Sequence, residues 1–338
     1  MSSTPTINDV ASRAGVSRQT VSRVINDKPE VSPSTRARVQ SVIDELGYQP
    51  HAVARSLVTG RTYTLGCISP NLIDYTFACI IEGAQAEARR QGYLVLTGSA
   101  PEVDDVEHLV DEMLRRQVDG LLVLNPHMDG RHRFFPPLAE EGLAVAYLKN
   151  TLKGNKISSV CCDNRQGGYQ ATRYLIELGH RSIATVLGPD NEECTHDRLD
   201  GYRRALSEAD LALDPELVVS GDWTATSGFD AVEQLLGAGE PPTAIFAQND
   251  RMAVGAIRAL REAGLEVPEK VSVIGFDDIP LASYFDPPLS TVRQPMEESG
   301  KLAARMLIKT VQDPRRPPEQ VFTESRLIKR RSCAPAGG

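Results

Sequence analysis

The stretch "TINDVASRAGVSRQTVSRVIND", residues 6–27, gathers arginine, glutamine and hydroxyl side chains within a chain whose formal net charge is −8. Thr6 is a good N-cap, and Asp9 three residues later completes a capping box. Gly15 suits the left-handed conformation that ends many helices, and Ser17 is placed to cap a second helix. The stretch therefore predicts two short helices joined by a tight glycine turn.

A third helix is predicted from about residue 34 to residue 46, with Gly47 as its stop. Apolar residues recur at helical spacing in all three segments, namely Ile7, Val10, Ala11, Ala14, Val21, Val24, Ile25, Val39, Val42, Ile43 and Leu46. Two short helices across a glycine turn, with a third packed beneath them, form the helix-turn-helix arrangement.

In that arrangement the N-terminal end of the second helix enters the major groove of DNA. Arg18 and Gln19 directly follow the cap, and Arg23 comes about one turn later. Arginine can bond bidentately to guanine and glutamine to adenine, and hydroxyls near a helix N-terminus can bind phosphates. A solvated polar helix face would contain similar residues, so the helix-turn-helix context is what favours DNA. The expected contacts are Thr6, Ser17, Arg18, Gln19, Thr20, Ser22 and Arg23.

The distribution of charge agrees with a DNA-facing N-terminal segment. Residues 1–62 contain eight basic and five acidic side chains, a net charge of +3. The remainder contains 29 basic and 40 acidic side chains, a net charge of −11. Such asymmetry is typical of a protein with one nucleic-acid-binding end, and the acidic body should be repelled by DNA phosphates.

From residue 63 onward, apolar runs alternate with amphipathic helical stretches such as "ACIIEGAQAEARRQG" and "DVEHLVDEMLRRQ". The apolar runs are "YTLGCIS", "YLVLTGS", "DGLLVLN", "LAVAYLK", "SIATVLG", "TAIFAQN" and "VSVIGFDD". Near-continuous apolar strands between amphipathic helices predict parallel sheets in α/β layers, and two successive sets predict two similarly built halves. Ligands of such sheets bind beyond the carboxyl ends of the strands.

Polar side chains follow several of these strands, and an arginine and the only tryptophan lie nearby. They are Asn125, Asp163, Asn249, Asp250, Asp277, Asp278, Arg198 and Trp223. Carboxylates, amides and an arginine can bond to vicinal hydroxyls while an aromatic face packs on C–H groups, which fits a sugar. A structural role stays open for each: Asn249, Asp250 or Asp278 can cap the next helix, Arg198 can form a surface ion pair, and Trp223 can be a core aromatic.

Together with "VSPSTRARVQSVIDELGYQPHAVARSLVTGRT", residues 31–62, the opening stretch closely resembles the N-terminal region of the lac repressor/galactose repressor family. The resemblance implies a transcription regulator, expected to be a repressor, that binds a palindromic DNA operator as a homodimer. It also implies a hinge helix that begins at Pro50, with Leu57 as the wedge that opens a minor-groove step and with Ala54 and Arg55 as its neighbouring contacts. Val58 departs from relatives that place a basic residue there.

The rest of the chain resembles the effector domain of that family, which is similar to periplasmic sugar-binding proteins. Arg198 matches the R-x-x-G-Y/F motif, Asn249 the N-D motif and Asp277 the "GFDD" motif, which bind effector in relatives. Asp163 and Trp223 match positions used by sugar-responsive members, Phe77 matches an aromatic of purine-responsive ones, and Gln294 lies in the "LSTVRQP" crossover. The expected effector residues are Phe77, Asn125, Asp163, Arg198, Trp223, Asn249, Asp277 and Gln294.

These observations predict an all-α helix-turn-helix domain over residues 1–49, a hinge and linker over 50–62, and an α/β effector and dimerisation domain over 63–338. The last is expected to be periplasmic-binding-protein-like, with two doubly wound subdomains at about 63–163 with 293–322 and about 164–292 with 323–338. The effector is expected to be a carbohydrate, with a purine or a phosphorylated metabolite as the alternative. A solute-binding protein without DNA function is disfavoured by residues 1–60.

Other classes lack support in the sequence. There is no G-x-S-x-G, Walker A or G-x-G-x-x-G motif, so an enzyme is not expected. The six cysteines and six histidines are dispersed, so neither a metal site nor a disulfide framework is predicted, and no cofactor is expected. No apolar run is long enough to span a membrane and no secretory signal is present, which predicts a cytoplasmic protein. The C-terminal segment lacks a leucine heptad repeat, which favours a dimer over a tetramer.

Overall fold

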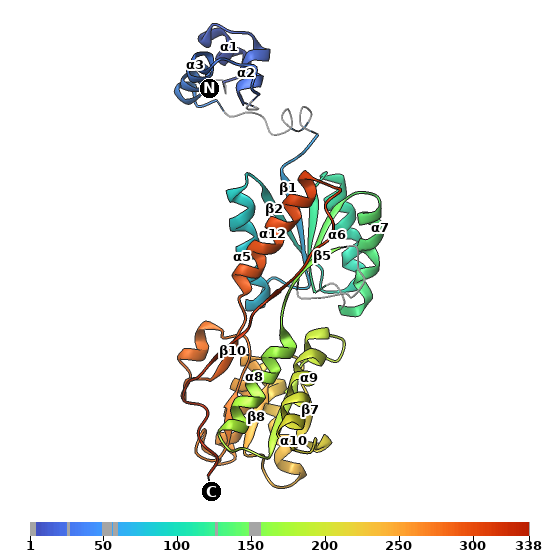
Figure 1. The fold of residues 1–338 in the computed structure, drawn as a ribbon, viewed down its shortest axis with the longest axis vertical. Coiled ribbons are helices and arrows are strands. Elements are labelled where there is room, and N and C mark those ends of the chain that lie inside the picture. The colour runs from blue at the N-terminus through green and yellow to red at the C-terminus, as the bar shows by residue number, and fades with distance from the viewer. Residues whose placement is uncertain are drawn as a thin grey trace. The chain divides into compact units, whose positions relative to one another are not determined.

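The computed structural model describes residues 5–25, 28–48, 56, 60–125, 128–148 and 157–337 (Figure 1). The chain forms two compact units, Met1–Tyr63 and Thr64–Gly338. Within the described residues, no helix is both long and apolar enough to cross a membrane.

The first unit contains the three predicted helices, which are α1 (Ile7–Ala14), α2 (Arg18–Ile25) and α3 (Pro33–Leu46). The backbone N–H of Thr6 donates to Asp9 Oδ2 at 2.7 Å, as the capping box predicts. Gly15 ends α1 at φ 64°, in the left-handed region, and Ser17 Oγ accepts from the backbone N–H of Thr20 at 3.1 Å. Local sequence signals therefore determine both ends of α1 and the start of α2.

The core of this unit is small and made almost entirely of valine and alanine. Its buried members are Val10, Ala11, Ala14, Val21, Val24, Val31, Val39 and Val42. They come from all three helices and from the segment that precedes α3. The helical spacing of the sequence thus predicts which faces meet, and the polar face of α2 is left exposed.

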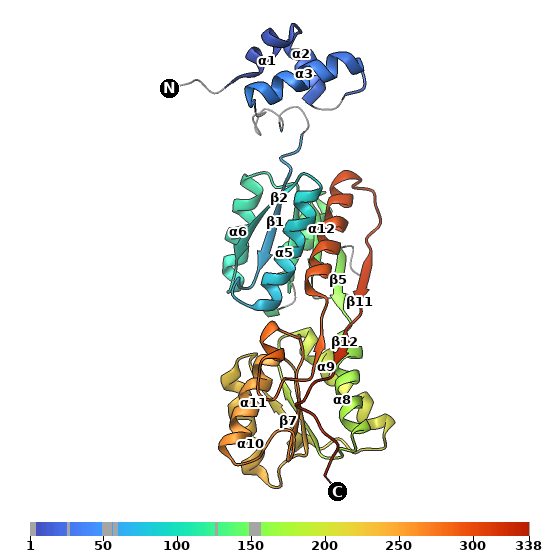
Figure 2. The ribbon, with the colours of Figure 1, turned by 90° about the vertical axis from the view of Figure 1, so that its left-hand side faces the viewer.

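The second unit begins with a six-stranded parallel sheet in the order β11-β5-β4-β3-β1-β2. Helices α5 and α12 pack together on one face, and α6, η1 and α7 cover the other (Figures 1 and 2). The bounds are β1 (Thr64–Ser69), α5 (Tyr75–Arg90), β2 (Leu94–Ser99), α6 (Val103–Arg115), β3 (Gly120–Leu124), η1 (Met128–Phe134), α7 (Phe135–Glu140), β4 (Ala144–Leu148), β5 (Ser158–Cys162), α12 (Met296–Gln312) and β11 (Gln320–Thr323).

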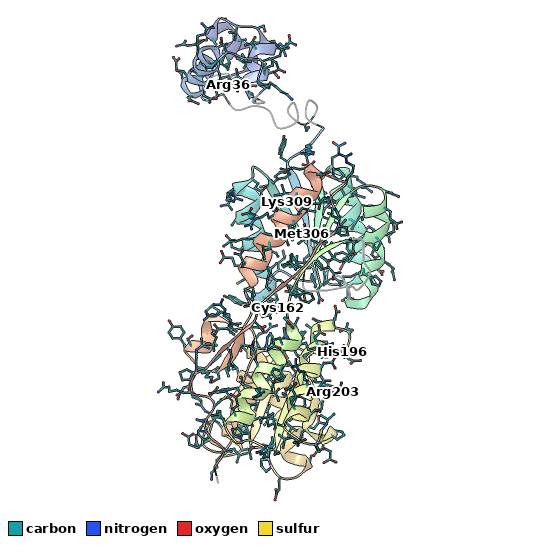
Figure 3. The ribbon with its side chains drawn as sticks, in the orientation of Figure 1. Arg36, Cys162, His196, Arg203, Met306 and Lys309 are labelled. Atoms are coloured by element: carbon teal, nitrogen blue, oxygen red, sulfur yellow. The ribbon has the colours of Figure 1, made fainter. Side chains whose placement is uncertain are left out.

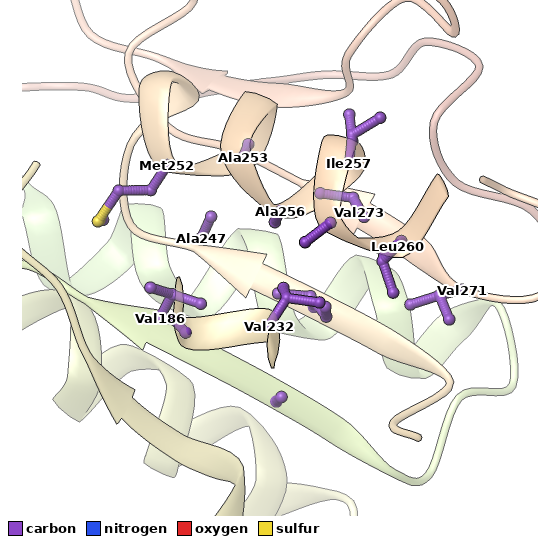
Figure 4. Close-up of a cluster of buried hydrophobic side chains, with 14 of the residues drawn as sticks. Val186, Val232, Ala247, Met252, Ala253, Ala256, Ile257, Leu260, Val271 and Val273 are labelled. Atoms are coloured by element: carbon purple, nitrogen blue, oxygen red, sulfur yellow. The ribbon is translucent and has the colours of Figure 1, made fainter. Parts of the chain in front are cut away.

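A second parallel sheet has the order β7-β6-β8-β9. Helices α8 and α9 pack on one face, and α10 and α11 on the other, over the aliphatic cluster of Figure 4. The bounds are α8 (Asn164–Glu177), β6 (Ile183–Leu187), α9 (Glu193–Glu208), η2 (Pro215–Leu217), β7 (Val218–Ser220), α10 (Ala225–Ala238), β8 (Ala244–Ala247), α11 (Asp250–Glu262), β9 (Ser272–Ile274) and η3 (Pro280–Ser283).

Three segments connect the two halves of this unit. One follows β5, where Cys162 lies between the halves (Figure 3). The others lead from β10 (Thr291–Arg293) to α12 and from β11 to β12 (Arg326–Ile328), and β10 pairs antiparallel with β12. The two halves are therefore joined by three connecting segments, which suits a change in their relative position.

Close packing joins α5 to α12. A Cβ on Gly83 would lie 2.0 Å from the carbonyl oxygen of Glu297, and one on Gly300 would lie 1.9 Å from that of Ile80. The two backbones approach so closely that only glycine fits at these positions. Beside this contact, buried Glu87 accepts from Arg90 Nη2 at 2.7 Å and from Arg305 Nε at 3.2 Å.

We expect Glu87→Gln to lower the free energy of unfolding by about 2 kcal/mol at pH 7. The hydrogen bonds from Arg90 and Arg305 lower the pKa of Glu87 from 4.5 to about 2. The stabilisation expected from this shift is smaller than the full value because Arg90 is largely exposed to solvent. A carboxylate whose pKa is lowered in the folded state stabilises the fold at pH values above its ordinary pKa. This contribution is lost as the pH falls toward 2. Urea unfolding at several pH values should show the difference between variant and parent shrinking below pH 4.5. Glu82→Gln, an exposed site on the same helix, should show no such difference.

Candidate DNA interface and effector cleft

The polar face of α2 has the composition expected of a base-reading surface. Arg18, Gln19 and Arg23 are exposed, and their side chains form no hydrogen bond or ion pair with another described residue. Thr6 and Ser17 are exposed too, and Thr20 and Ser22 are partly buried. The side chains of Arg18, Gln19 and Arg23 are therefore available to an external partner.

A cavity of about 280 Å³ lies between the two halves of the second unit. Its walls come from the segments that follow β1, β2, β6, β7, β8 and β9, which are the carboxyl ends of strands in both sheets. We call this cavity the effector cleft. Its lining residues are Pro70, Asn71, Asp74, Thr76, Phe77, Pro101, Glu192, Cys194, Arg198, Asp222, Trp223, Asn249, Arg251 and Asp277.

Arg198 forms part of the floor of the effector cleft and is only 2% exposed. Its Nε donates to Asn164 Oδ1 at 2.9 Å, and its Nη1 donates to the carbonyl oxygen of Gln248. The guanidinium carbon lies 3.7 Å from the centroid of the Phe276 ring. These contacts hold the guanidinium plane in place and use two of its three nitrogens, so Nη2 is the group left to donate to a ligand.

Trp223 lies next to Arg198, with the guanidinium carbon 5.5 Å from the centroid of the indole. Its Nε1 donates to Glu192 Oε1 at 2.9 Å, and its carbonyl oxygen accepts from Asn249 Nδ2 at 3.0 Å. The residue has a φ of 70°, a strained conformation for a bulky side chain that structures retain mainly at functional sites. The indole is therefore held at both its ring nitrogen and its backbone.

Gly188 makes room for the indole, and we expect Gly188→Ala to displace it. A Cβ at this position would lie 2.0 Å from a ring carbon of Trp223. We predict a red shift of Trp223 emission and a loss of effector affinity of about tenfold. Gly237→Ala on α10 is the matched control, because its Cβ would meet nothing within 4 Å and alanine favours the helix. Equal behaviour of the two variants would show that the indole does not depend on Gly188.

Asn249 and Asp277 both line the effector cleft and both have internal partners. Asn249 is the N-cap of α11, with Oδ1 accepting from the backbone N–H of Met252 at 2.8 Å, so the capping role left open by the sequence is present. Asp277 has a φ of 114°, and its Oδ1 accepts from Gln294 Nε2 at 2.6 Å. Helix capping and backbone geometry thus fix the positions of two polar groups beside Arg198.

An ion pair joins the two halves of the unit at the effector cleft. Arg251 Nη2 on α11 lies 2.6 Å from Asp74 Oδ2, and Asp74 Oδ1 caps α5 by accepting from the backbone N–H of Thr76 at 2.8 Å. Because Arg251 is exposed, the pair contributes at most about 1 kcal/mol. Its position makes it sensitive to any change in the separation of the halves.

Of the predicted effector residues, five line the effector cleft, and they are Phe77, Arg198, Trp223, Asn249 and Asp277. Three do not. Asn125 is buried at the end of β3, Asp163 caps α8 through the backbone N–H of Gln166, and Gln294 lies behind Asp277 on the wall of another cavity. The predicted hinge contacts Ala54, Arg55 and Leu57 fall outside the described residues.

Several residues of the effector cleft are not among those predicted from the sequence. They are Asn71, Asp74, Glu192, Cys194, Asp222 and Arg251. Asp74 and Glu192 occupy N-cap positions, and they follow β1 and β6 as the predicted residues follow their strands, so the same rule applied to every loop would have found them. In the part of the chain that the structure describes, no group of three histidine, cysteine or acidic residues is placed to hold a metal ion.

Comparisons with known proteins agree with this architecture. Residues 6–51 match the family model described as bacterial regulatory proteins, lacI family, and residues 172–333 match the periplasmic binding protein-like domain. The chain is 37% identical over 338 residues to the HTH-type transcriptional repressor PurR of Proteus mirabilis, with 97% of each chain covered.

Two solved structures extend the similarity to three dimensions. A transcriptional regulator CelR–cellobiose complex is 36% identical with a TM-score of 0.75, covering 97% of this chain and 99% of that one. The lac repressor dimer bound to operator and the anti-inducer ONPF is 30% identical with a TM-score of 0.85, covering 98% and 100%.

The exposed polar face of α2 and the effector cleft define a DNA-binding protein with a periplasmic-binding-protein-like effector domain. The chain belongs to the lacI family of bacterial regulatory proteins, and it is a DNA-binding transcriptional repressor. The family and the fold class predicted from the sequence are confirmed.

Proposed function

We propose that this repressor binds a palindromic operator as a homodimer in the cytoplasm and that a carbohydrate in the effector cleft controls its operator affinity. A carbohydrate effector is supported by the arrangement of Arg198, Trp223 and Asp277 in one cavity. A donor, an acceptor and an aromatic face then meet the hydroxyls and C–H groups of one sugar ring. The similar CelR structure is a complex with cellobiose, which makes β-linked disaccharides the first candidates.

The proposed mechanism has two states. Effector binding changes the relative position of the two halves of the second unit, which are joined by three connecting segments. This change alters the separation of the two DNA-binding units of the dimer. The effector must bind the two states with different affinity, because otherwise it shifts nothing. The predicted domain division at residues 1–49, 50–62 and 63–338 is part of this proposal, as are the effector roles of Asn125, Asp163 and Gln294.

The homodimer is supported by exposed apolar side chains on the second unit. Ile73 is 95% exposed and Tyr284 is 85% exposed, and Leu72, Tyr75 and Leu281 are exposed beside them in sequence. The segments that contain these residues, 72–75 and 281–284, border a cavity of about 500 Å³ that is lined by Tyr75, Ile279 and Pro280. Apolar groups gathered in this way are typical of an interaction surface, and a palindromic operator requires twofold symmetry. A sedimentation mass of four chains, or of one, would contradict the dimer.

The ligand class is tested by a panel on the purified full chain, with monosaccharides, disaccharides including cellobiose, purines and sugar phosphates. Thermal stability and the emission of Trp223, the only tryptophan, are recorded together. A ligand at a hundred times its dissociation constant adds about 2.7 kcal/mol to stability. A carbohydrate that stabilises the protein, changes Trp223 emission and shifts operator affinity is the expected result. Stabilisation by a purine or a phosphate alone would refute the carbohydrate.

The proposed hinge wedge gives a separate prediction for DNA binding. Leu57→Ala should weaken operator binding about tenfold and reduce the bend of the operator, because alanine is too short to hold a base step open. Gel mobility of operator fragments with the site at different positions measures the bend, and anisotropy measures the affinity. Unchanged affinity and bend would remove Leu57 from the DNA interface.

A further inference from the structure

The effector cleft is lined by more carboxylates than cations. Four acidic side chains line it, namely Asp74, Glu192, Asp222 and Asp277, against two basic ones, Arg198 and Arg251. Arg251 is paired with Asp74. The buried charge of Arg198 forms no ion pair with any described residue. The carboxylates that line the effector cleft are therefore the charges in its lining that can balance Arg198.

Glu192 is held at both of its carboxylate oxygens. It is 7% exposed at the N-terminal end of α9. Its Oε1 accepts from Trp223 Nε1 at 2.9 Å, and its Oε2 accepts from the thiol of Cys194 at 3.5 Å. The carboxylate is thus fixed to the aromatic wall of the effector cleft, on the same helix as Arg198.

The remaining bonding capacity of Glu192 restricts what can bind beside it. An ionised carboxylate has about four acceptor positions and no donor, and the two bonds above use two of them. A ligand hydroxyl can donate to the others. An ionised carboxylate ligand or a phosphate monoester dianion has no hydrogen to donate there. Any ionised carboxylate, and any phosphate that keeps one proton or none, also adds a repulsive charge in a partly desolvated site.

We propose that Glu192 determines the specificity of the effector cleft, selecting an uncharged, hydroxyl-rich effector and excluding phosphorylated or carboxylated ones. This inference rests on the proposed function, because it concerns the ligand of the same site. Arg198 alone would attract an anion, as buried arginines commonly do. Glu192 cancels that attraction and leaves a donor from Arg198 and acceptors from Glu192 and Asp277, which a neutral hydroxyl, both donor and acceptor, can satisfy.

Glu192→Gln removes the negative charge of the side chain and keeps its shape. The amide keeps the length of the side chain and an oxygen that can accept from Trp223 Nε1, so the indole should stay in place. Glu193→Gln is the matched control, because it removes the same charge one residue away on the same helix end, yet Glu193 does not line the cleft. Unchanged Trp223 emission in both ligand-free variants verifies that the aromatic wall is intact.

The experiment titrates glucose 6-phosphate, inorganic phosphate and glucose into the full-length parent protein, Glu192→Gln and Glu193→Gln, with calorimetry and Trp223 emission as readouts. We expect Glu192→Gln to bind glucose 6-phosphate at least about tenfold more tightly than the parent does. Glu193→Gln should stay within about twofold of the parent. The ratio of affinities for glucose 6-phosphate and glucose should rise only in Glu192→Gln.

Three results would overturn the proposal. They are no gain for Glu192→Gln, an equal gain for Glu193→Gln, or a parent protein that already binds glucose 6-phosphate more tightly than glucose. The proposed function fails by a different result, which is that no carbohydrate alters operator affinity. The phosphate affinities of the two variants are measured without DNA, so the two failures are distinguishable.

Discussion

Arg198→Met is expected to lower effector affinity at least about a hundredfold while operator affinity without effector stays near that of the parent. The arginine is the buried donor of the effector cleft, and methionine of similar length cannot replace hydrogen bonds from a charged group, each of which contributes about 1.5–3 kcal/mol. The measurement is calorimetric titration with the effector found in the panel, together with operator anisotropy.

Arg203→Met is the control for this change. It removes the same charge from the same helix, but Arg203, labelled in Figure 3, is 50% exposed. Its guanidinium pairs with Asp200. Its effector affinity should match that of the parent. Because Arg198→Met also leaves Asn164 and Gln248 without their donor, some loss of stability is expected, and effector binding is compared at a temperature where both variants are folded. Parental effector affinity in Arg198→Met would contradict the assignment.

Gln19→Ala and Arg18→Ala are the changes with the largest expected effect on DNA binding. Each should cost about 1–3 kcal/mol of operator affinity and relax the sequence preference at one base pair in each half-site, because a bidentate base contact is lost. Competition of operator variants against the parent operator, at fixed salt concentration, measures both effects.

Arg38→Ala separates base reading from general attraction to DNA. Arg38 is exposed on α3 and lies in the same unit as Arg18, so its loss lowers the positive charge equally. We expect a smaller and sequence-independent loss of affinity from this change. Equal loss of specificity in Arg38→Ala and Arg18→Ala would show that α2 does not read bases.

The helix-turn-helix unit was predictable from the sequence because its signals are local. Asp9, Gly15 and Ser17 act within one turn of the helices that they begin or end, and the valine-rich core follows the 3.6-residue period. The buried parallel strands were predictable for a similar reason, since continuous apolar runs flanked by amphipathic helices rarely form any other structure.

The effector cleft was only partly predictable, because it is assembled across the two sheets. Asn125 and Asp163 each follow a strand, as the cleft residues do, yet both lie outside its lining. Nothing local in the sequence distinguishes them from Glu192, whose position depends on the indole of Trp223. The cross-cleft pair of Asp74 and Arg251 joins residues 177 positions apart, a contact that only the arrangement of the two halves produces.

Coupling between the effector cleft and operator DNA is tested most directly by the operator affinity of the full-length protein with and without saturating effector. We predict a shift of tenfold or more in the parent, no shift in Arg198→Met, and a reciprocal shift of effector affinity when operator is saturating, because the two binding free energies are linked. Tight effector binding with unchanged operator affinity would contradict this coupling.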